Sequence, residues 1–442
     1  MNPGDTPAGA QGAPSSGDAL HRFVSELYPI CRSLTGDGVR RTLAAIGRHI
    51  PLEVHEVPSG TPVFDWTVPL EWNLRDAHVK NRAGEKVIDV NRSNLHLVGY
   101  SEPVRARVSR AELEAHLFSL PDHPEWIPYR TSYYQRTWGF CVTEQQRAAL
   151  TDDEYEVVID TSLAPGHLTW GECVLPGETT DEILLSCHVC HPSLCNDNLS
   201  GIAVATFLAR QLGQERRRHT VRVLFIPGTI GSITWLAQHE ATAARVRHGL
   251  VLTCLGDAGA VTYKQTRRGT APVDQAAAHV LQHTGRPFTI DAFSPWGYDE
   301  RQYSSPGFDM PVGCLMRTPH GRFPEYHTSA DNLDLVRPES LADSLETALE
   351  IVRVVDRDAR YSNLNPKCEP QLGRRGLYGA IGGVPNAPRR QMAMLWVLNL
   401  SDGRHSLLDI ADRAGMPFDA VDEAADLLLQ HGLLGRCEAP VA

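Results

Sequence analysis

Residues 186–201 carry the side chains of this chain best suited to chemistry. They read Ser-Cys-His-Val-Cys-His-Pro-Ser-Leu-Cys-Asn-Asp-Asn-Leu-Ser-Gly and lie between an apolar strand-like segment, 182–185, and a helical segment, 202–212. A histidine at a strand end and an aspartate before a helix can converge on one point, and neutral imidazole and carboxylate are ligands that zinc prefers. His188 and Asp197 are therefore candidate metal ligands. The alternative is a capped polar turn with a satisfied histidine.

The elements around this stretch alternate between strands and helices. We predict strands at 155–159, 168–174, 183–186, 221–226, 250–254 and 312–316, and helices at 202–212, 233–239, 273–283 and 338–355. Such alternation is typical of an α/β layer domain with a mostly parallel mixed sheet, in which sites lie beyond the carboxyl ends of strands. His188 and Asp257 both follow such an end.

Composition divides the chain into further parts. Residues 1–18 are rich in Gly, Pro, Ala and Ser and predict a disordered tail. Residues 54–151 hold short Val- and Trp-containing segments broken by Gly, Pro and Asn, which predicts a β-rich insert between two parts of the α/β domain, 19–53 and 152–365. A Pro/Gly-rich linker, 366–390, then leads to a compact helical unit, 391–437, whose order of helices suggests a winged helix.

The overall charge and the cysteines limit the class of protein. The net charge is -11 and the sequence pI is about 5.9, which argues against a nucleic-acid binder. No apolar stretch approaches the roughly 20 residues needed to cross a bilayer, so no membrane partner is expected. The N-terminus lacks the apolar core of a signal peptide. Ten cysteines without an export signal predict reduced thiols in the cytoplasm.

Four further segments of the predicted α/β domain contain polar residues in loops, two of them directly after predicted strands. A Gly-Ser loop, 227–232, follows one predicted strand and Asp257 follows another, and two polar segments, 297–303 and 324–332, come later in the chain. Together with the first stretch, the order is His, Asp, Gly-Ser loop, Asp, His on an α/β sheet.

With these motifs, the chain resembles the zinc aminopeptidase superfamily of bacterial leucyl aminopeptidases and glutamate carboxypeptidases. More closely, it resembles the aminopeptidase-like domain proteins of bacterial polysaccharide and natural-product gene clusters. The second resemblance rests on the segments 29–36, 64–69, 299–303 and 368–373, and covers nearly all of 19–437. It implies a three-layer metallopeptidase-like α/β domain of the phosphorylase/hydrolase-like type, with a small β-rich insert and a C-terminal winged helix.

The resemblance also implies a ligand set and a reaction. The metal ligands of the superfamily fall on His188, Asp197, Asp257 and His327, with zinc as the cofactor and Asp197 between two ions. The implied activity is hydrolysis of an amide or peptide bond, or a related transfer, in a small biosynthetic intermediate or peptide.

The sequence departs from the superfamily at Gly228, where many relatives carry a glutamate that binds the second ion. Glycine offers neither a ligand nor a base, so we expect one zinc ion rather than two. Three interpretations stay open: a metal site with altered chemistry, a substitute carboxylate, or a non-hydrolytic binding scaffold in a biosynthetic assembly. The candidate substitutes are Glu325, which shares a face with His327 if that segment is extended, and then Glu300. His191 is a further candidate for acid/base chemistry.

Two other motifs suggest different functions. The Cys187-x-x-Cys190 pair could form a zinc knot or a redox pair, but no second knuckle follows, and buried cysteines at a strand end are the better interpretation. Residues 389–442 hold five arginines and eight acidic residues, a net charge of 5 - 8 = -3, which opposes contact with phosphate. We therefore expect 391–437 to dock on the body, on a second subunit or on a carrier protein.

Overall fold

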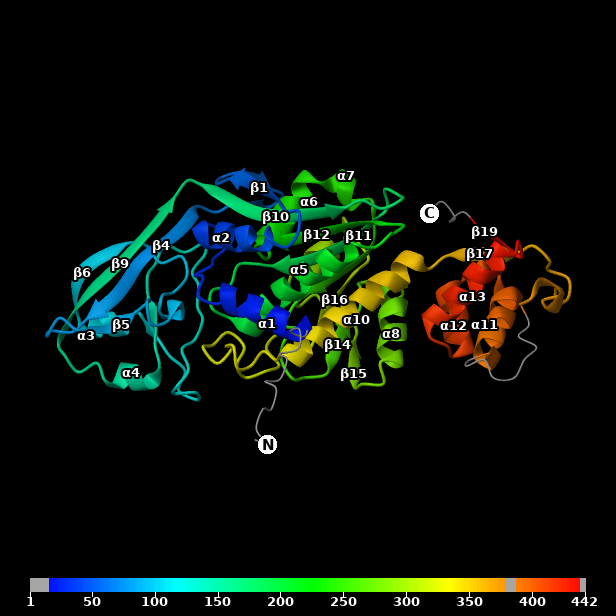
Figure 1. The fold of residues 1–442 in the computed structure, drawn as a ribbon. Helices are drawn as coiled ribbons and strands as arrows, with labels where there is room; N and C mark the ends of the chain where they lie inside the picture. Colours follow the sequence, from blue (N-terminus) through cyan, green and yellow to red (C-terminus); the bar gives the residue numbers. More distant parts are fainter. Residues whose placement is uncertain (1–15, 378–386, 438–442) are drawn as a thin grey trace, which may run out of the picture.

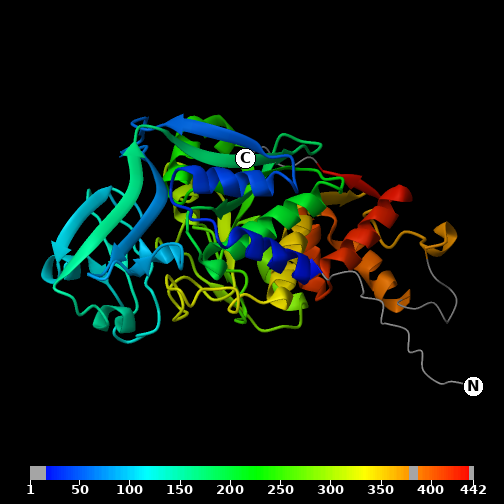
Figure 2. The ribbon, with the colours of Figure 1, turned by 60° about the vertical axis from the view of Figure 1, so that its left-hand side comes forward.

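The computed structural model describes residues 16–377 and 387–437. Figure 1 shows three parts side by side: the β-rich insert, the central α/β domain and the C-terminal helical module. Figure 2, turned by 60°, shows the same order, with the insert at the far end from the module. The expected disordered tail, 1–18, overlaps helix α1 (Ser16–Leu27), and its remainder lies outside the described residues.

The central domain is built on an eight-stranded mixed sheet. Its strand order is β1-β10-β12-β11-β13-β16-β14-β15, and the four strands from β12 to β16 are parallel neighbours. The strands are β1 (Glu53–Pro58), β10 (His167–Leu175), β11 (Glu182–His188), β12 (Thr220–Ile226), β13 (Val246–Leu252), β14 (Val261–Lys264), β15 (Phe288–Asp291) and β16 (Val312–Met316). The prediction of a mostly parallel mixed α/β sheet is confirmed.

Helices cover both faces of this sheet, which makes three layers. Because side chains alternate along a strand, Ile183 and Leu185 of β11 pack into one apolar core and Leu184 packs into the other. The first core contains residues of α1, α2 (Asp37–Ile46), α5 (Gly201–Leu212), α8 (Pro272–His283) and α10 (Pro338–Arg357). The second contains residues of α6 (Ile230–Gln238), α7 (Glu240–Ala243) and α9 (Glu300–Tyr303).

The insert contains a four-stranded antiparallel sheet in the order β5-β4-β9-β6. Its strands are β4 (Glu71–Lys80), β5 (Lys86–Asp89), β6 (Val104–Ser109) and β9 (Glu154–Ala164). Smaller elements complete it: β2 (Pro62–Val63), β3 (Trp66–Thr67), β7 (Leu117–Phe118), β8 (Phe140–Cys141), α3 (Arg110–Glu114) and α4 (Glu144–Ala148). The chain leaves α3 at Ala115 and enters β7 at Leu117.

The boundaries predicted for the insert, 54 and 151, need correction. The first falls inside β1, which pairs with β10 in the main sheet, and the second excludes β9, which is the central partner of β4 and β6. An amphipathic segment predicts a strand but not the sheet that it joins, because the pairing partner is distant in sequence.

The C-terminal module combines three helices with a three-stranded sheet in the order β18-β17-β19. Its elements are β17 (Arg360–Asn363), α11 (Ala387–Leu400), β18 (Asp402–Ser406), α12 (Leu407–Ala414), α13 (Phe418–Gln430) and β19 (Leu434–Arg436). The module thus begins with β17, within the range that the sequence reading gave to the α/β domain. Part of the predicted linker, 378–386, lies outside the described residues. Ser406 and Asp409 form a capping box at the start of α12.

Polar contacts dock this module on the central domain. The Gln275 and His279 side chains of α8 contact the Asp412 carboxylate of α12, with 2.6 Å between His279 Nδ1 and Asp412 Oδ1. Arg357, the last residue of α10, forms ion pairs with Asp419 and Asp422 at the start of α13. Part of the acidic face of α13 is therefore turned toward the body of the protein.

Candidate metal centre

Asp197 is the centre of a group of buried polar side chains at the carboxyl edge of the sheet. His188 is the last residue of β11, and the chain returns through a loop and a single irregular turn, Cys195–Ser200, into α5. Asp331 fixes this turn, because its carboxylate accepts hydrogen bonds from the backbone N–H groups of Asn196 and Asp197, at 2.5 and 2.9 Å. Burial raises the pKa of Asp331 to about 8.

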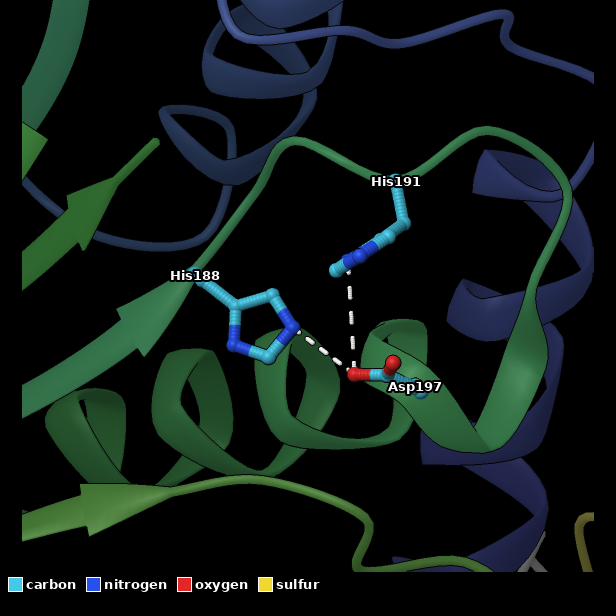
Figure 3. Close-up of side chains that lie close together, drawn as sticks. All are labelled: His188, His191 and Asp197. Atoms are coloured by element: carbon cyan, nitrogen blue, oxygen red, sulfur yellow. Dashed lines mark hydrogen bonds and ion pairs between the residues drawn. The ribbon is translucent and has the colours of Figure 1, made fainter. Parts of the chain in front are cut away.

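Three histidines converge on the two oxygens of Asp197. Nε2 of His188 lies 2.8 Å from Oδ1, Nε2 of His327 lies 3.0 Å from Oδ2, and Nδ1 of His191 lies 4.0 Å from Oδ1. Figure 3 shows the rings of His188 and His191 both directed at this carboxylate. Burial raises the pKa of Asp197, but the three imidazoles outweigh burial and hold that pKa well below its usual range. The carboxylate is therefore ionised and can bind a cation.

His191 has the properties of a ligand without a partner. Burial keeps the pKa of His191 well below its usual value. Its Nδ1 atom is buried and has no hydrogen-bond partner in the described structure. An orphaned imidazole nitrogen beside an ionised carboxylate is a reason to expect a metal ion there, because a buried polar atom normally has a partner.

A second possible group shares Asp197. The Cys254 thiol and the His320 ring each bring a ligand atom within 4.8 Å of each other and of the Asp197 carboxylate. Cys254 comes shortly after β13, and its φ of 49° turns the chain at that point. Neither residue was predicted from the sequence, although the position of Cys254 at a strand end was the available signal. Asp257, three residues later, was predicted as the metal ligand instead.

Asp257 does not join either group. Its Oδ1 accepts hydrogen bonds from the Thr318 hydroxyl and the Gly259 N–H, and its Oδ2 accepts one from the Asn196 amide at 2.9 Å. These contacts tie three loops together beneath the site. In this structure Asp257 therefore positions these loops and lies outside both groups of possible ligands.

The two carboxylates expected to replace the missing glutamate lie in different surroundings. Glu300 is buried, with Oε1 at 2.9 Å from the Lys264 ammonium, and it also accepts the Tyr298 N–H. Glu325 is half-buried, but the argument that it shares a face with His327 fails, because that segment is a turn in which His327 has φ 58°. Neither belongs to the two groups of possible ligands found among the described residues.

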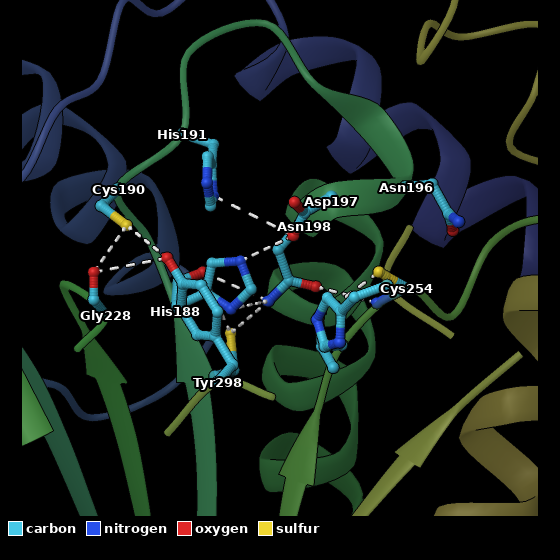
Figure 4. A network of polar contacts seen from close by, with 12 residues as sticks. His188, Cys190, His191, Asn196, Asp197, Asn198, Gly228, Cys254 and Tyr298 are labelled. Atoms are coloured by element: carbon cyan, nitrogen blue, oxygen red, sulfur yellow. Dashed lines mark hydrogen bonds and ion pairs between the residues drawn. The ribbon is translucent and has the colours of Figure 1, made fainter. Parts of the chain in front are cut away.

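The Tyr298 ring fills the place beside Gly228. A Cβ atom at residue 228 would lie 2.0 Å from Cε1 of Tyr298, so no larger residue fits there while the ring stays in position. The ring also packs on His188, with 3.9 Å between centroids, and its hydroxyl lies 3.3 Å from the Cys190 thiol (Figure 4). Burial holds the Tyr298 pKa well above its usual value, so the hydroxyl is neutral. The glycine and the tyrosine therefore form one packed unit.

A cavity of about 280 Å³ opens next to this centre. His320, which belongs to the second ligand group, also lines the cavity, so the cavity borders that group. Half of the other lining residues are polar or charged: Lys264, Asp291, Ser294, Glu300 and Arg322. Trp296 stands at the opening with 77% of its surface exposed.

Comparison with known proteins shows the family to which this chain belongs. The model of a family described as "Domain of unknown function (DUF4910)" matches residues 21–358, and that of a winged helix-turn-helix matches residues 359–436. The chain belongs to the DUF4910 family. It is 51% identical to a Clostridium acetobutylicum protein provisionally named a polysaccharide biosynthesis protein with an aminopeptidase-like domain, over 96% of this chain and 98% of that protein.

Solved structures support the same placement. A crystal structure of a protein from Clostridium acetobutylicum, provisionally named a peptidase, aligns with a TM-score of 0.91 at 50% identity over 96% of this chain and 97% of that one. A zinc aminopeptidase from Bacillus subtilis aligns with a TM-score of 0.55 at 12% identity, over 77% of this chain and 95% of that one, which shows a shared fold. The predicted aminopeptidase-like fold and the C-terminal winged helix are thus confirmed.

Proposed function

We propose that this protein is a zinc-dependent hydrolase, or a related transferase, that acts on an amide bond of a small biosynthetic intermediate. The observation that carries this proposal is the convergence of His188, His191 and His327 on the ionised Asp197. Imidazole and carboxylate donors fit zinc, and three protein ligands with one open position are typical of its catalytic sites. When bound, zinc would polarise the scissile carbonyl and lower the pKa of a water molecule.

We further propose one zinc ion per chain, held by His188, His191 and Asp197. The ligand atoms of these residues lie within 4.8 Å of one another, and all three residues are buried. His191 thus takes the place that the sequence reading gave to Asp257. The group of Asp197, Cys254 and His320 could take a second ion only by sharing the same carboxylate.

Other residues of the chain have proposed roles in substrate binding and proton transfer. The charged cavity beside His320 suits a small polar substrate better than a bulky apolar side chain, because Lys264 and Arg322 offer donors and Asp291 offers an acceptor. We keep Glu325 as the proposed general base, since it is half-buried on the loop that supplies His327, whereas Glu300 is paired with Lys264.

A non-hydrolytic scaffold remains the second candidate, and one observation favours it. The Tyr298 ring closes the position from which a glutamate would bind the second ion and take a proton. Such a protein would bind the same polar ligand in the same cavity without turnover.

Metal analysis combined with a hydrolysis assay tests these proposals. The purified chain and an Asp197→Asn variant would be compared for zinc content and for release of amine from a panel of small polar amides. Zinc and turnover in the parent, with both lost in the variant, support the hydrolase. Zinc without turnover on any amide supports the scaffold, and absence of bound zinc at micromolar supply overturns both metal assignments.

The remaining proposals concern the cellular compartment and the partners of the protein. All ten cysteines are free, and seven are buried, which suits a reducing compartment such as the cytoplasm. Among the described residues, no helix is both long and apolar enough to cross a membrane. We propose that the winged helix docks on the body through α8 and α10, and that its remaining surface serves a second subunit or a carrier protein rather than nucleic acid.

A further inference from the structure

A second cavity, of about 610 Å³, lies between the α/β domain and the winged helix. It is lined by residues that precede or begin the parallel strands, such as Asp181 before β11 and Arg218 before β12. His188 stands at the other end of β11, so this cavity is at the opposite edge of the sheet from the proposed metal centre. It is large enough for a nucleotide-sized ligand, and domain seams are common places for such sites.

Four arginines line this cavity, two from each side of the seam. Arg218 and Arg247 belong to the α/β domain, whereas Arg360 belongs to β17 and Arg436 to β19. The lining also holds two aspartates, Asp181 and Asp358, so its formal charge is 4 - 2 = +2. The whole chain has a net charge of -11, which makes this basic lining unusual for the molecule.

Most of these guanidinium groups are not neutralised. Arg247 pairs with Asp181 at 3.0 Å, but Arg218 and Arg360 donate to the backbone carbonyls of Asp358 and Arg404. Within residues 16–377 and 387–437, no carboxylate forms an ion pair with Arg218, Arg360 or Arg436. Donors that face a cavity without an anionic partner are available to a ligand.

Two histidines extend the polar lining. Nδ1 of His219 lies 3.1 Å from the Asp356 carboxylate, whereas Nδ1 of His248 is buried without a hydrogen-bond partner in the described structure. Burial, followed by His219 and Arg218, lowers the pKa of His248 to about 3. Its ring is therefore neutral, and its Nδ1 is an unsatisfied polar group at this cavity.

We propose that this cavity binds a phosphorylated small molecule of nucleotide size. Guanidinium groups recognise phosphate oxygens with paired hydrogen bonds, and four of them from two sides can surround a di- or triphosphate. Because the arginines come from both domains, a bound phosphate would link the winged helix to the α/β domain. The proposal does not depend on the metal centre or on the proposed hydrolysis.

Isothermal titration of the full chain with ATP and with inorganic pyrophosphate tests this site. The test variant is Arg360→Gln/Arg436→Gln, because both side chains are exposed and their loss should leave the fold intact. Its matched control is Arg107→Gln, an exposed arginine of the insert. We expect both probes to bind the parent and the control alike, and the double variant to bind about tenfold or more weakly. Absence of binding to the parent, or equal binding to the double variant, overturns the proposal.

One further arm separates this site from binding at the metal centre. Pyrophosphate can also bind a metal ion, so the titration is repeated after dialysis against EDTA, and the affinity should not change. Loss of binding after dialysis would show that pyrophosphate binds at the metal centre and would overturn the proposal.

Discussion

The Tyr298 ring occupies the space that any side chain at residue 228 would need, since a Cβ atom there would lie 2.0 Å from Cε1 of that ring. The same ring packs on His188, and its hydroxyl contacts Cys190. An aromatic ring therefore fills the space beside Gly228, where the resemblance to zinc aminopeptidases implied a glutamate. Restoring the glutamate alone cannot restore the site.

The first prediction concerns this pair. Gly228→Glu alone should lower stability by about 1–3 kcal/mol, because it overpacks a buried position, and should not raise amide hydrolysis. The double variant Gly228→Glu/Tyr298→Ala should recover stability relative to Gly228→Glu and bind more zinc per chain. Thermal unfolding and elemental analysis measure both effects, and a gain of activity in the single variant would contradict the packing argument.

The second prediction concerns His191 as a zinc ligand. His191→Ala should weaken zinc binding by more than the roughly 10–100-fold that loss of an outer-shell partner costs. Competition with a chromophoric chelator measures this affinity. His123→Ala is the matched control, since His123 is an exposed histidine of the insert that stacks on Trp126. Equal zinc affinity of His191→Ala and the control would remove His191 from the ligand set.

The third prediction uses cobalt to locate the ion. If the first ion binds His188, His191 and Asp197, one equivalent of Co²⁺ should give visible bands but no thiolate-to-cobalt charge-transfer band. A second equivalent, if it binds, should produce that band through Cys254, and Cys254→Ser should abolish it. A charge-transfer band at the first equivalent would place the preferred ion on the Cys254 side instead.

Much of this site could be predicted from the sequence, but only where the signal was local. His188 and Asp197 follow from a strand end and a capped turn, and the alternating apolar segments predicted the sheet that brings them together. Cys254 and His320 were missed, because their approach to Asp197 depends on a backbone turn with positive φ and on a loop distant in sequence. Tyr298 could not be placed, since its packing on Gly228 is a tertiary contact between residues 70 positions apart.

The fourth prediction concerns the pH dependence that Asp331 gives to metal-free protein. Burial raises the pKa of Asp331 to about 8 in the folded chain, against about 3.9 unfolded. Between these values the folded state binds more protons, so this residue makes stability fall as pH rises from about 4 to 8. Asp331→Asn should remove that slope but leave one backbone N–H of the turn unsatisfied, at a cost of about 1–3 kcal/mol. Chemical denaturation at several pH values measures both effects. If the free energy of unfolding of the variant keeps the same pH dependence, a group other than Asp331 causes it.

The last prediction is that the winged helix does not bind duplex DNA. In α13, Asp419 and Asp422 pair with Arg357 of the body, so the start of this helix is already engaged. Val421, Ala425 and Leu428 are buried on the inner side, and neither lysine nor arginine occurs in α13 to contact phosphate. A gel shift at near-physiological salt should show no complex, and Arg357→Ala, which frees the acidic face, should not create one. A salt-sensitive complex that disappears when residues 389–442 are deleted would contradict this prediction and show that the module binds DNA.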